Sequence, residues 1–274
     1  MRLIKKLSNY FKSILFYFKG DIIENKLKKL HNIHLGEECY IFGDGVSIKH
    51  FDLSLFNDKP SIVSNNFIFH KDFNKLNVKY YSMFEPYWFL PIFVTGFKGI
   101  KFLINRIQKT HIKKFKLNPN IIFFTDISNA LSLKGNNVSY IEKTLIKTFM
   151  PFDAGEIDLC QGSLRVEISL AILLGFKKAY LIGHDYTHKD AYALHYYEKG
   201  NGTKVKPSIW NKDFLEIVSQ HIDITTVTLN GGSPLLKSIT YKKLTGNTPV
   251  FRENIEIVDK KDLQTLSSWP GYKI

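Results

Sequence analysis

The densest group of residues able to do chemistry is GHDYTHKDAYALHYYEKGNG, from Gly183 to Gly202, which holds three histidines, two aspartates and four tyrosines. A neutral imidazole is the commonest general base near pH 7, and tyrosine hydroxyls can hydrogen-bond a departing phosphate without a metal ion. The group therefore predicts acid–base chemistry on a phosphate-linked substrate. Metal binding is an alternative, although the spacing fits no standard zinc signature; its ligands would be His184, His188, Asp190 and His195. A loop that is merely polar is the third interpretation.

A second group of candidates surrounds a turn with two glycines. The apolar residues 40–42 run into Gly43, Asp44 and Gly45, and a hydroxyl follows at Ser47. This order is typical of a strand that ends in a tight turn, where glycine lets the backbone approach a nucleotide or phosphate closely. The turn is not a P-loop, and it lacks the third glycine of a dinucleotide fingerprint. A tight turn that binds nothing is the alternative interpretation.

The elements that must position these residues alternate between strands and helices. Apolar segments predict strands near residues 40–42, 60–69, 77–85, 120–126, 178–182 and 225–230, and helical spacing predicts a helix over residues 162–176. A Gly-Gly turn and a short helix beginning near Ser233 and Pro234 are expected after the last strand. Such alternation indicates an α/β fold with a mostly parallel sheet, whose carboxyl ends share one edge.

Polar residues recur at the predicted carboxyl ends of the strands, where a ligand would bind. Asparagine side chains suit a base and a ribose, and Ser163, at the start of the long helix, can offer its hydroxyl and nearby N–H groups to a phosphate. The residues expected at this edge are Asp44, Ser47, Asn65, Asn66, Glu85, Asp126, Asp185 and Tyr186.

The length of 274 residues fits one large domain. We expect a basic amphipathic helical segment over residues 1–35, a domain over residues 36–249 with a basic helical insertion at 95–118, and a C-terminal tail over 250–274. Cys39 and Cys160 lie in apolar stretches without metal-ligand spacing, which predicts buried thiols in a reducing cytoplasm.

The net charge of +13, from 38 Lys+Arg and 25 Asp+Glu, indicates an anionic partner. Residues 1–19 contain no acid and place Leu3, Leu7, Phe11, Ile14 and Phe18 at helical spacing, which predicts a helix lying at a membrane surface, or an ordinary packed helix. The acid-free residues 98–116 predict a second basic helix. The longest apolar run near the N-terminus is too short to span a bilayer, and no secretory cleavage site follows. Nucleic acid is not an expected partner, because no zinc finger, RNA-recognition signature or helix-turn-helix is present.

Several blocks resemble the bacterial sialyltransferases of the Campylobacter type. YIFGDGVSIKHFDLSLFNDKPSIVSNNFIFH is similar to their opening, where a G-N-G-P-S-L turn precedes a strand ending in C-N-x-F, and GSLRVEISLAILLGFKKAYLIGHDYTHKDAYAL is similar to their helix and strand with S-G, A-x-A-L-G-Y, G-x-D-F and S-Y-A. NGGSPLL resembles their N-S-L-L segment, and LIGHDYTH with HYYEKG is similar to a related group of uncharacterised carbohydrate transferases. The similarity covers about two thirds of the chain, in the family's order.

The resemblance implies a modified Rossmann fold of the GT-A type without a metal-binding D-x-D motif, and transfer of a nonulosonic acid from a CMP donor with inversion. By this resemblance Asn65 and Asn66 contact the nucleotide, Ser163 the donor phosphate or carboxylate, and Tyr192 the departing phosphate, with Tyr186 as a second candidate. Asp185 matches the family's strand-end aspartate. The chain departs from the family where Asp44 and Glu85 replace asparagines, and these carboxylates would repel an anionic donor unless a cation compensates or one is protonated.

The catalytic base is assigned to His195 by position and chemistry, with Glu85 and Asp44 as alternatives, because the loop after Tyr192 is shorter than in the family. The predicted function is metal-independent transfer of a sialic-acid-like sugar to a cell-surface glycan or glycolipid, as in capsule or lipopolysaccharide synthesis, by a cytoplasmic enzyme on the inner face of the bacterial membrane. No cofactor is expected. The alternatives are a transferase that uses another nucleotide sugar or a pyrophosphate donor, and a non-catalytic peripheral protein that binds anionic lipid or nucleic acid.

Overall fold

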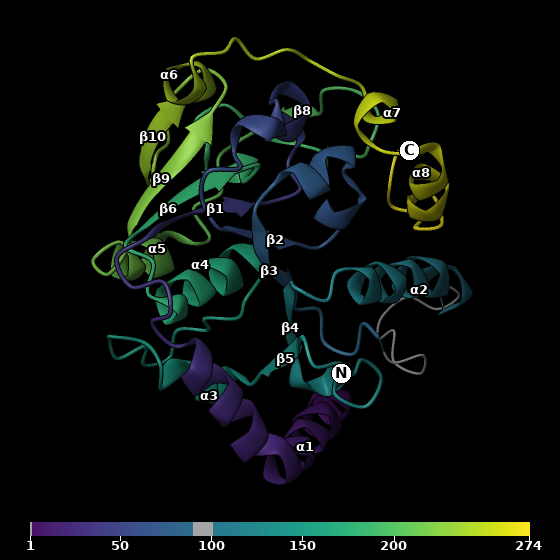
Figure 1. The fold of residues 1–274 in the computed structure, drawn as a ribbon, viewed down its shortest axis with the longest axis vertical. Helices are drawn as coiled ribbons and strands as arrows, with labels where there is room; N and C mark the ends of the chain where they lie inside the picture. Colours follow the sequence, from purple (N-terminus) through teal and green to yellow (C-terminus); the bar gives the residue numbers. More distant parts are fainter. Residues whose placement is uncertain (1, 90–100) are drawn as a thin grey trace.

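The computed structural model describes residues 2–89 and 101–274, with the side chains of residues 10–89 and 106–274. Its centre is an eight-stranded sheet in the order β10-β9-β6-β1-β2-β3-β4-β5, in which every neighbouring pair is parallel (Figure 1). The strands are β1 (Glu38–Phe42), β2 (Ser61–Ser64), β3 (Val78–Met83), β4 (Ile122–Asp126), β5 (Val138–Ile141), β6 (Lys178–Ile182), β9 (Asp223–Thr228) and β10 (Lys237–Thr240). The expected α/β class with a mostly parallel sheet is confirmed.

Two layers of helix and loop cover the sheet. On the face of the sheet that carries Cys39 and Ile41, residues of α1 (Arg2–Leu30) and α4 (Ser163–Leu174) form the first core cluster. The second core cluster lies on the opposite face, which carries Tyr40 and Phe42. Because β1 is buried on both faces, it reads as a continuous apolar run, as strands of covered parallel sheets do. The other helices are α2 (Lys101–Leu117), α3 (Lys143–Lys147), α5 (Lys212–Val218), α6 (Tyr241–Thr245), α7 (Asn254–Ile257) and α8 (Lys260–Leu266).

Short 3₁₀ segments follow several strands at their carboxyl ends. They are η1 (Val46–His50), η2 (Leu53–Leu55), η3 (Phe67–Phe69), η4 (Lys71–Lys75), η5 (Ile127–Asn129) and η6 (Asp185–Thr187). A small antiparallel pair, β7 (Ala191–Ala193) with β8 (Thr203–Val205), lies outside the main sheet. Neither this pair nor β5 was predicted from the sequence.

The helix predicted near Ser233 is wrong. The Ser233 hydroxyl accepts the N–H groups of Leu235 and Leu236 as a helix cap would, but it also donates to the carbonyl of Thr187 at 2.6 Å. The chain then runs beside β9 as β10, and the helix in this region, α6, starts only at Tyr241. Pairing with the sheet edge therefore overrides the local helix signal.

The segment expected as a C-terminal tail is packed against the domain. Ile257, Val258, Leu263 and Leu266 are buried in the second core cluster, and α8 lies beside α2 (Figure 1). The Lys114 ammonium also pairs with the Asp262 carboxylate at 2.8 Å. Both cysteines are buried and free, as expected.

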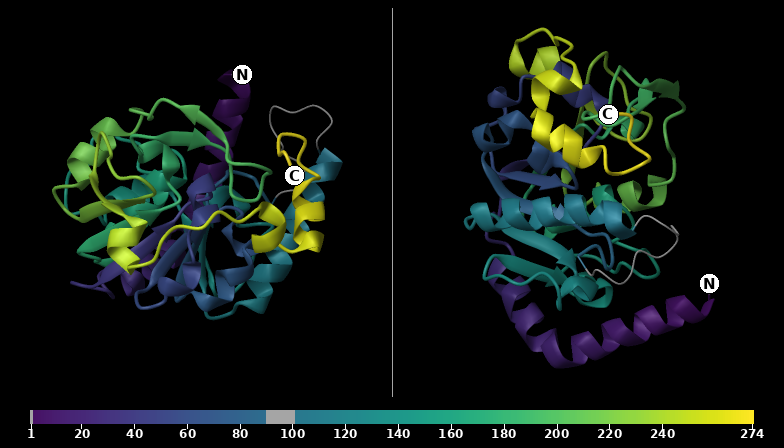
Figure 2. Two further views of the ribbon diagram at one scale, coloured as in Figure 1. Left: turned by 90° about the horizontal axis from the view of Figure 1, so that it is seen from above. Right: turned by 90° about the vertical axis from the view of Figure 1, so that its right-hand side faces the viewer.

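The N-terminal helix α1 runs along one side of the molecule and extends past its body (Figure 2). Its Leu15, Ile23 and Leu27 are buried against the first core cluster. Of the predicted apolar stripe, Phe11 packs against this cluster, whereas Ile14 and Phe18 are exposed. The other exposed apolar residues of α1 are Tyr10, Tyr17 and Ile22. The side chains of Leu3 and Leu7 lie outside the described residues. Within the described residues, no helix combines the length and the apolar character needed to cross a bilayer.

Candidate active site

The predicted site lies where the strand order reverses between β1 and β6, at the carboxyl edge of the sheet. The two-glycine turn after β1 interlocks there with the turn after β6. A Cβ added at Gly45 would lie 2.4 Å from the carbonyl oxygen of Gly183, and one added at Gly43 would lie 2.8 Å from the same atom. The contact between the two turns therefore requires both glycines, whatever ligand is bound.

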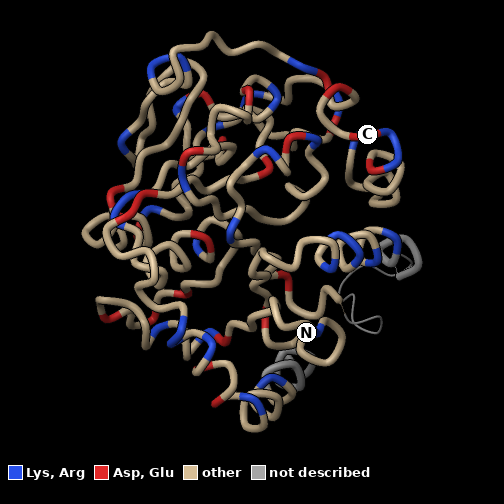
Figure 3. The backbone as a smooth tube through the Cα atoms, in the orientation of Figure 1, with Lys and Arg blue, Asp and Glu red and all other residues tan. Residues whose placement is uncertain are grey.

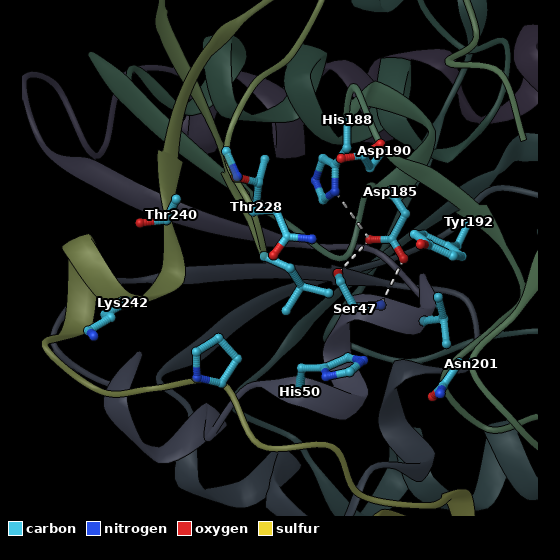
Figure 4. A pocket seen from close by; sticks show the side chains of 15 residues that line it. Ser47, His50, Asp185, His188, Asp190, Tyr192, Asn201, Thr228, Thr240 and Lys242 are labelled. Atoms are coloured by element: carbon cyan, nitrogen blue, oxygen red, sulfur yellow. Dashed lines mark hydrogen bonds and ion pairs between the residues drawn. The ribbon is translucent and has the colours of Figure 1, made fainter. Parts of the chain in front are cut away.

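Asp185 holds this pair of turns together. Its Oδ2 accepts the Ser47 N–H at 2.7 Å and its Oδ1 accepts the Ser47 hydroxyl (Figure 4). His188 Nδ1 lies 3.9 Å from the same carboxylate. Both predicted residues, Asp185 and Ser47, are thus buried and engaged with each other at the wall of a cavity of about 620 Å³ that Tyr192 also lines.

Asp44 and Asn66 form a second buried link. The Asp44 carboxylate accepts the Asn66 N–H at 3.0 Å, and Asn66 Nδ2 donates to the hydroxyls of Tyr197 and Tyr272 at 3.0 and 3.1 Å. Burial raises the pKa of Asp44 to about 7, although the charge of His195 and the Asn66 N–H oppose the shift. Asp44 is therefore partly protonated at neutral pH, which reduces its repulsion of an anionic ligand.

Behind the turns, His184 and Glu167 are fully buried with their side chains 3.4 Å apart. Burial lowers the pKa of His184 to about 3, so its imidazole is neutral at pH 7, and burial raises the pKa of Glu167, which favours the neutral form of that carboxyl group. A Cβ at Gly43 would meet the His184 ring at 2.9 Å. His184 is thus a core residue. Among the residues the structure describes, no three His, Cys, Asp or Glu side chains gather as a metal site, so the alternative metal set is not assembled.

His195 forms a dyad with a residue that the sequence analysis did not single out. Its Nδ1 lies 2.7 Å from the Glu198 carboxylate, and its ring stacks on Tyr197 at 5.0 Å with the planes 4° apart. Burial alone would raise the pKa of Glu198, but the hydrogen bonds from His195 and from the Lys273 N–H hold it at about 2. Burial disfavours the charged imidazole, yet Glu198 and Asp44 outweigh this effect and the pKa of His195 is raised. The His-x-x-Glu spacing was the available signal for this pair.

The N-terminus of α4 opens into two adjoining cavities. Both are lined by Gln161, Gly162 and Ser163, with volumes of about 300 and 330 Å³. The residue before the helix, Gly162, has φ +82° and supplies no side-chain cap. The first N–H groups of a helix lack partners within it and, with the helix dipole, favour an anion. This end of α4 can therefore hold a phosphate or carboxylate.

The two cavities contain different predicted residues. Asn65 and Glu85 line the 330 Å³ cavity together with Lys143, and Tyr186 lines the 300 Å³ cavity together with Trp210. Asn65 has φ +50°, a left-handed conformation that asparagine adopts more readily than most residues. The structure thus groups Ser163 with Asn65, Glu85 and Tyr186, whereas Ser47, Asp185 and Tyr192 line the larger cavity.

Cations partly balance the acids at this edge. Burial and the charge of Asp126 raise the pKa of Glu85, while Lys12 opposes the shift. Lys12, from α1, lies 2.8 Å from the Asp126 carboxylate, and Lys143 pairs with Asp158 at 2.6 Å. Neither lysine was predicted from the sequence to be part of the site.

Comparison with known proteins supports the fold. No protein-family model and no curated protein matches the chain. Among solved structures it is similar to the MAf glycosyltransferase from Magnetospirillum magneticum AMB-1, with a TM-score of 0.50 and 14% identity over 85% of this chain and 37% of that one. It therefore spans little more than a third of the MAf chain.

Two sialyltransferases from Campylobacter jejuni are also similar to the chain. CstII, in complex with a substrate analogue, matches with a TM-score of 0.42 and 18% identity over 85% of this chain and 98% of that one; Cst-I matches with 0.45 and 15% over 80% and 86%. At 14% identity, the similarity to the MAf glycosyltransferase indicates a shared fold alone. We conclude that the chain shares the fold of the part of the MAf glycosyltransferase that it matches.

Proposed function

We propose that this chain is a metal-independent, inverting glycosyltransferase of GT-A type that moves a nonulosonic acid from a CMP donor to a glycan acceptor. The observation that carries the proposal is the uncapped N-terminus of α4, which faces two cavities lined by Ser163 and by Asn65, Glu85 and Tyr186. A helix end of this kind suits the phosphate of a nucleotide sugar. The choice of CMP and of a nonulosonic acid rests on the sequence blocks that resemble the sialyltransferases.

The charges of the site are compatible with such a donor. Asp44 is partly protonated near pH 7, and burial favours the neutral form of Glu85. Lys143 lies at the wall of the same cavity as Glu85, and its ammonium group is also paired with Asp158. Protonation of Asp44 and of Glu85 would reduce the repulsion between an anionic donor and these two carboxyl groups, which replace asparagines of the resembled family.

In the proposed reaction the acceptor hydroxyl attacks the anomeric carbon in a single displacement. The new bond joins that carbon to the acceptor oxygen, the bond to the phosphate oxygen breaks, and CMP leaves with the electron pair. The hydroxyl proton passes to His195 Nε2, since Nδ1 is held by Glu198, and the Glu198 carboxylate stabilises the imidazolium. Hydrogen bonds from Tyr186 and the end of α4 stabilise the departing phosphate, whereas Tyr192 lines the larger cavity and is not assigned this role.

The proposed enzyme works on a lipid-linked or cell-surface glycan at the inner face of the bacterial cytoplasmic membrane. The exposed apolar side chains of α1 support this placement, because such a face inserts at the lipid interface. The basic residues of α2, among them Arg106, Lys109, Lys113 and Lys116, would attract anionic lipid (Figure 3).

Calorimetric titration with CMP, CDP, UDP and GDP, each with and without magnesium, tests the proposed donor. CMP-selective binding that does not need magnesium is expected. Magnesium-dependent preference for a diphosphate would overturn the proposed donor in favour of another nucleotide sugar. Absence of any nucleotide binding, together with salt-sensitive binding to anionic lipid or nucleic acid, would indicate the non-catalytic alternative.

A further inference from the structure

Trp210 presents an aromatic face at the end of α4. It lines the same 300 Å³ cavity as Ser163 and Tyr186, and the residue is 55% exposed. A Cβ added at Gly162, the residue that precedes α4, would lie 3.5 Å from the six-membered ring of this indole. An exposed tryptophan thus sits directly beside the helix end that suits a phosphate.

The indole is supported from behind by a buried cation. The Arg165 guanidinium lies over the Trp210 ring at 5.4 Å and over the Phe214 ring at 5.2 Å, so it is held between the two aromatic residues. Arg165 also donates to Asn211 Oδ1 at 2.8 Å and to the carbonyls of Asp158 and Trp210, each at 3.2 Å. With these contacts Arg165 is committed to the structure of the cavity wall and fixes the plane of the indole.

The segment that carries Trp210 is tied to the predicted site. The Ser208 N–H donates to the Tyr186 carbonyl at 3.0 Å, and the Ser208 hydroxyl accepts the Trp210 N–H at 3.3 Å. Trp210 is therefore held at a fixed position relative to both Tyr186 and the N-terminus of α4.

We propose that Trp210 is the platform on which the nucleobase of the donor stacks. The inference rests on the proposed function, since it takes the ligand to be a nucleotide. Bases stack on exposed aromatic faces, and one nucleotide can place its phosphate at the end of α4 while its base covers the neighbouring indole. Ser208 and Asn211, which line the same cavity, are polar groups within the space that the base would occupy.

Calorimetry with CMP and with ribose 5-phosphate, which has no base, tests this role. Trp210→Ala should weaken CMP binding roughly 5- to 150-fold and leave ribose 5-phosphate binding unchanged. Trp210→Phe should lose less, because it keeps an aromatic face. Ile209→Ala is the matched control: Ile209 is 71% exposed, precedes Trp210 and does not line this cavity, so its loss should leave both affinities unchanged.

The possible failures are distinguishable. If the wild-type protein binds CMP and Trp210→Ala binds it equally well, the stacking role is wrong while the proposed function stands. An equal loss for CMP and ribose 5-phosphate would also overturn stacking and show that Trp210 only shapes the end of α4. If the wild-type protein binds no nucleotide, the proposed function fails, and this inference fails with it.

Discussion

Replacing Glu198 with glutamine tests the role of the dyad most directly. Glutamine keeps a hydrogen-bond acceptor near His195 Nδ1 and near the Lys273 N–H but removes the charge. The fall in the pKa of Glu198 from its ordinary 4.5 to about 2 corresponds to an interaction free energy of about 3 kcal/mol if solvent does not screen the charges. The imidazole is 47% exposed, so solvent screens the ion pair, and its interaction free energy is reduced to about 1.5 kcal/mol.

Removing the charge should lower the pKa of His195, because Glu198 is one of the groups that raise it. Because His195 must be neutral to accept a proton, the acidic limb of the kcat/KM profile should move to lower pH in Glu198→Gln. The variant should also be less stable than the wild type at pH 7. The pKa of Glu198 is depressed in the fold, so the stability it contributes is present above pH 4.5 and is lost as the pH falls towards 2.

Two measurements on the same protein test the reasoning. NMR titration of the His195 ring reports its pKa, and the pH dependence of kcat/KM reports the catalytic base. Glu216→Gln, which removes an exposed carboxylate 3.7 Å from Lys212, should alter neither and serves as the control. An unchanged pKa of His195 would refute the electrostatic argument. A shifted pKa with an unchanged pH–rate profile would refute His195 as the base and direct attention to Glu85 or Asp44.

Three further predictions follow from the same geometry. His195→Ala should lower turnover sharply in a transfer assay while calorimetry shows nearly unchanged CMP affinity; lost CMP affinity would make His195 a binding residue instead. Asp44→Asn removes a buried acid whose pKa is raised to about 7 in the fold, so the wild type loses stability as the pH rises from about 4 to 7. The free energy of unfolding of the variant should therefore exceed that of the wild type by up to about 4 kcal/mol in denaturant titrations at pH 8. Equal free energies of unfolding at pH 8 would contradict the burial argument. Phe18→Ser, on the exposed face of α1, should weaken binding to phosphatidylglycerol vesicles at least about tenfold without changing activity on a soluble acceptor, whereas unchanged vesicle binding would remove the membrane proposal.

The fold was largely predictable because the central strands are buried on both faces and therefore appear as apolar runs. β5 and β2 have four residues each, but the apolar residues of η3 lengthen the apolar segment of β2, whereas Glu142 and Lys143 follow β5 directly. The edge strand β10, KSIT, has no fully buried residue, so its sequence lacks the pattern that marked the inner strands.

The site was less predictable, because similar neighbouring residues have different roles in the fold. Asn65 and Asn66 could not be distinguished in the sequence. The structure gives Asn65 a positive φ and a place at a cavity, while Asn66 is committed to two tyrosines. Trp210 was missed because its relevance depends on neighbours distant in the sequence, such as Arg165. Glu198 had a local signal in its spacing from His195, but its contact with the Lys273 N–H is visible only in the structure.

The long-range contacts around His195 impose an order on the maturation of the site. Glu198 accepts the Lys273 N–H across 75 positions, and Asn66 donates to Tyr272 across 206 positions. The two cavities at the end of α4 are lined by residues between Asn65 and Asn211, whereas the surroundings of His195 are complete only after residues 254–273 have also docked, which is an additional long-range step. A refolding chain should therefore regain affinity for a nucleotide before it regains turnover.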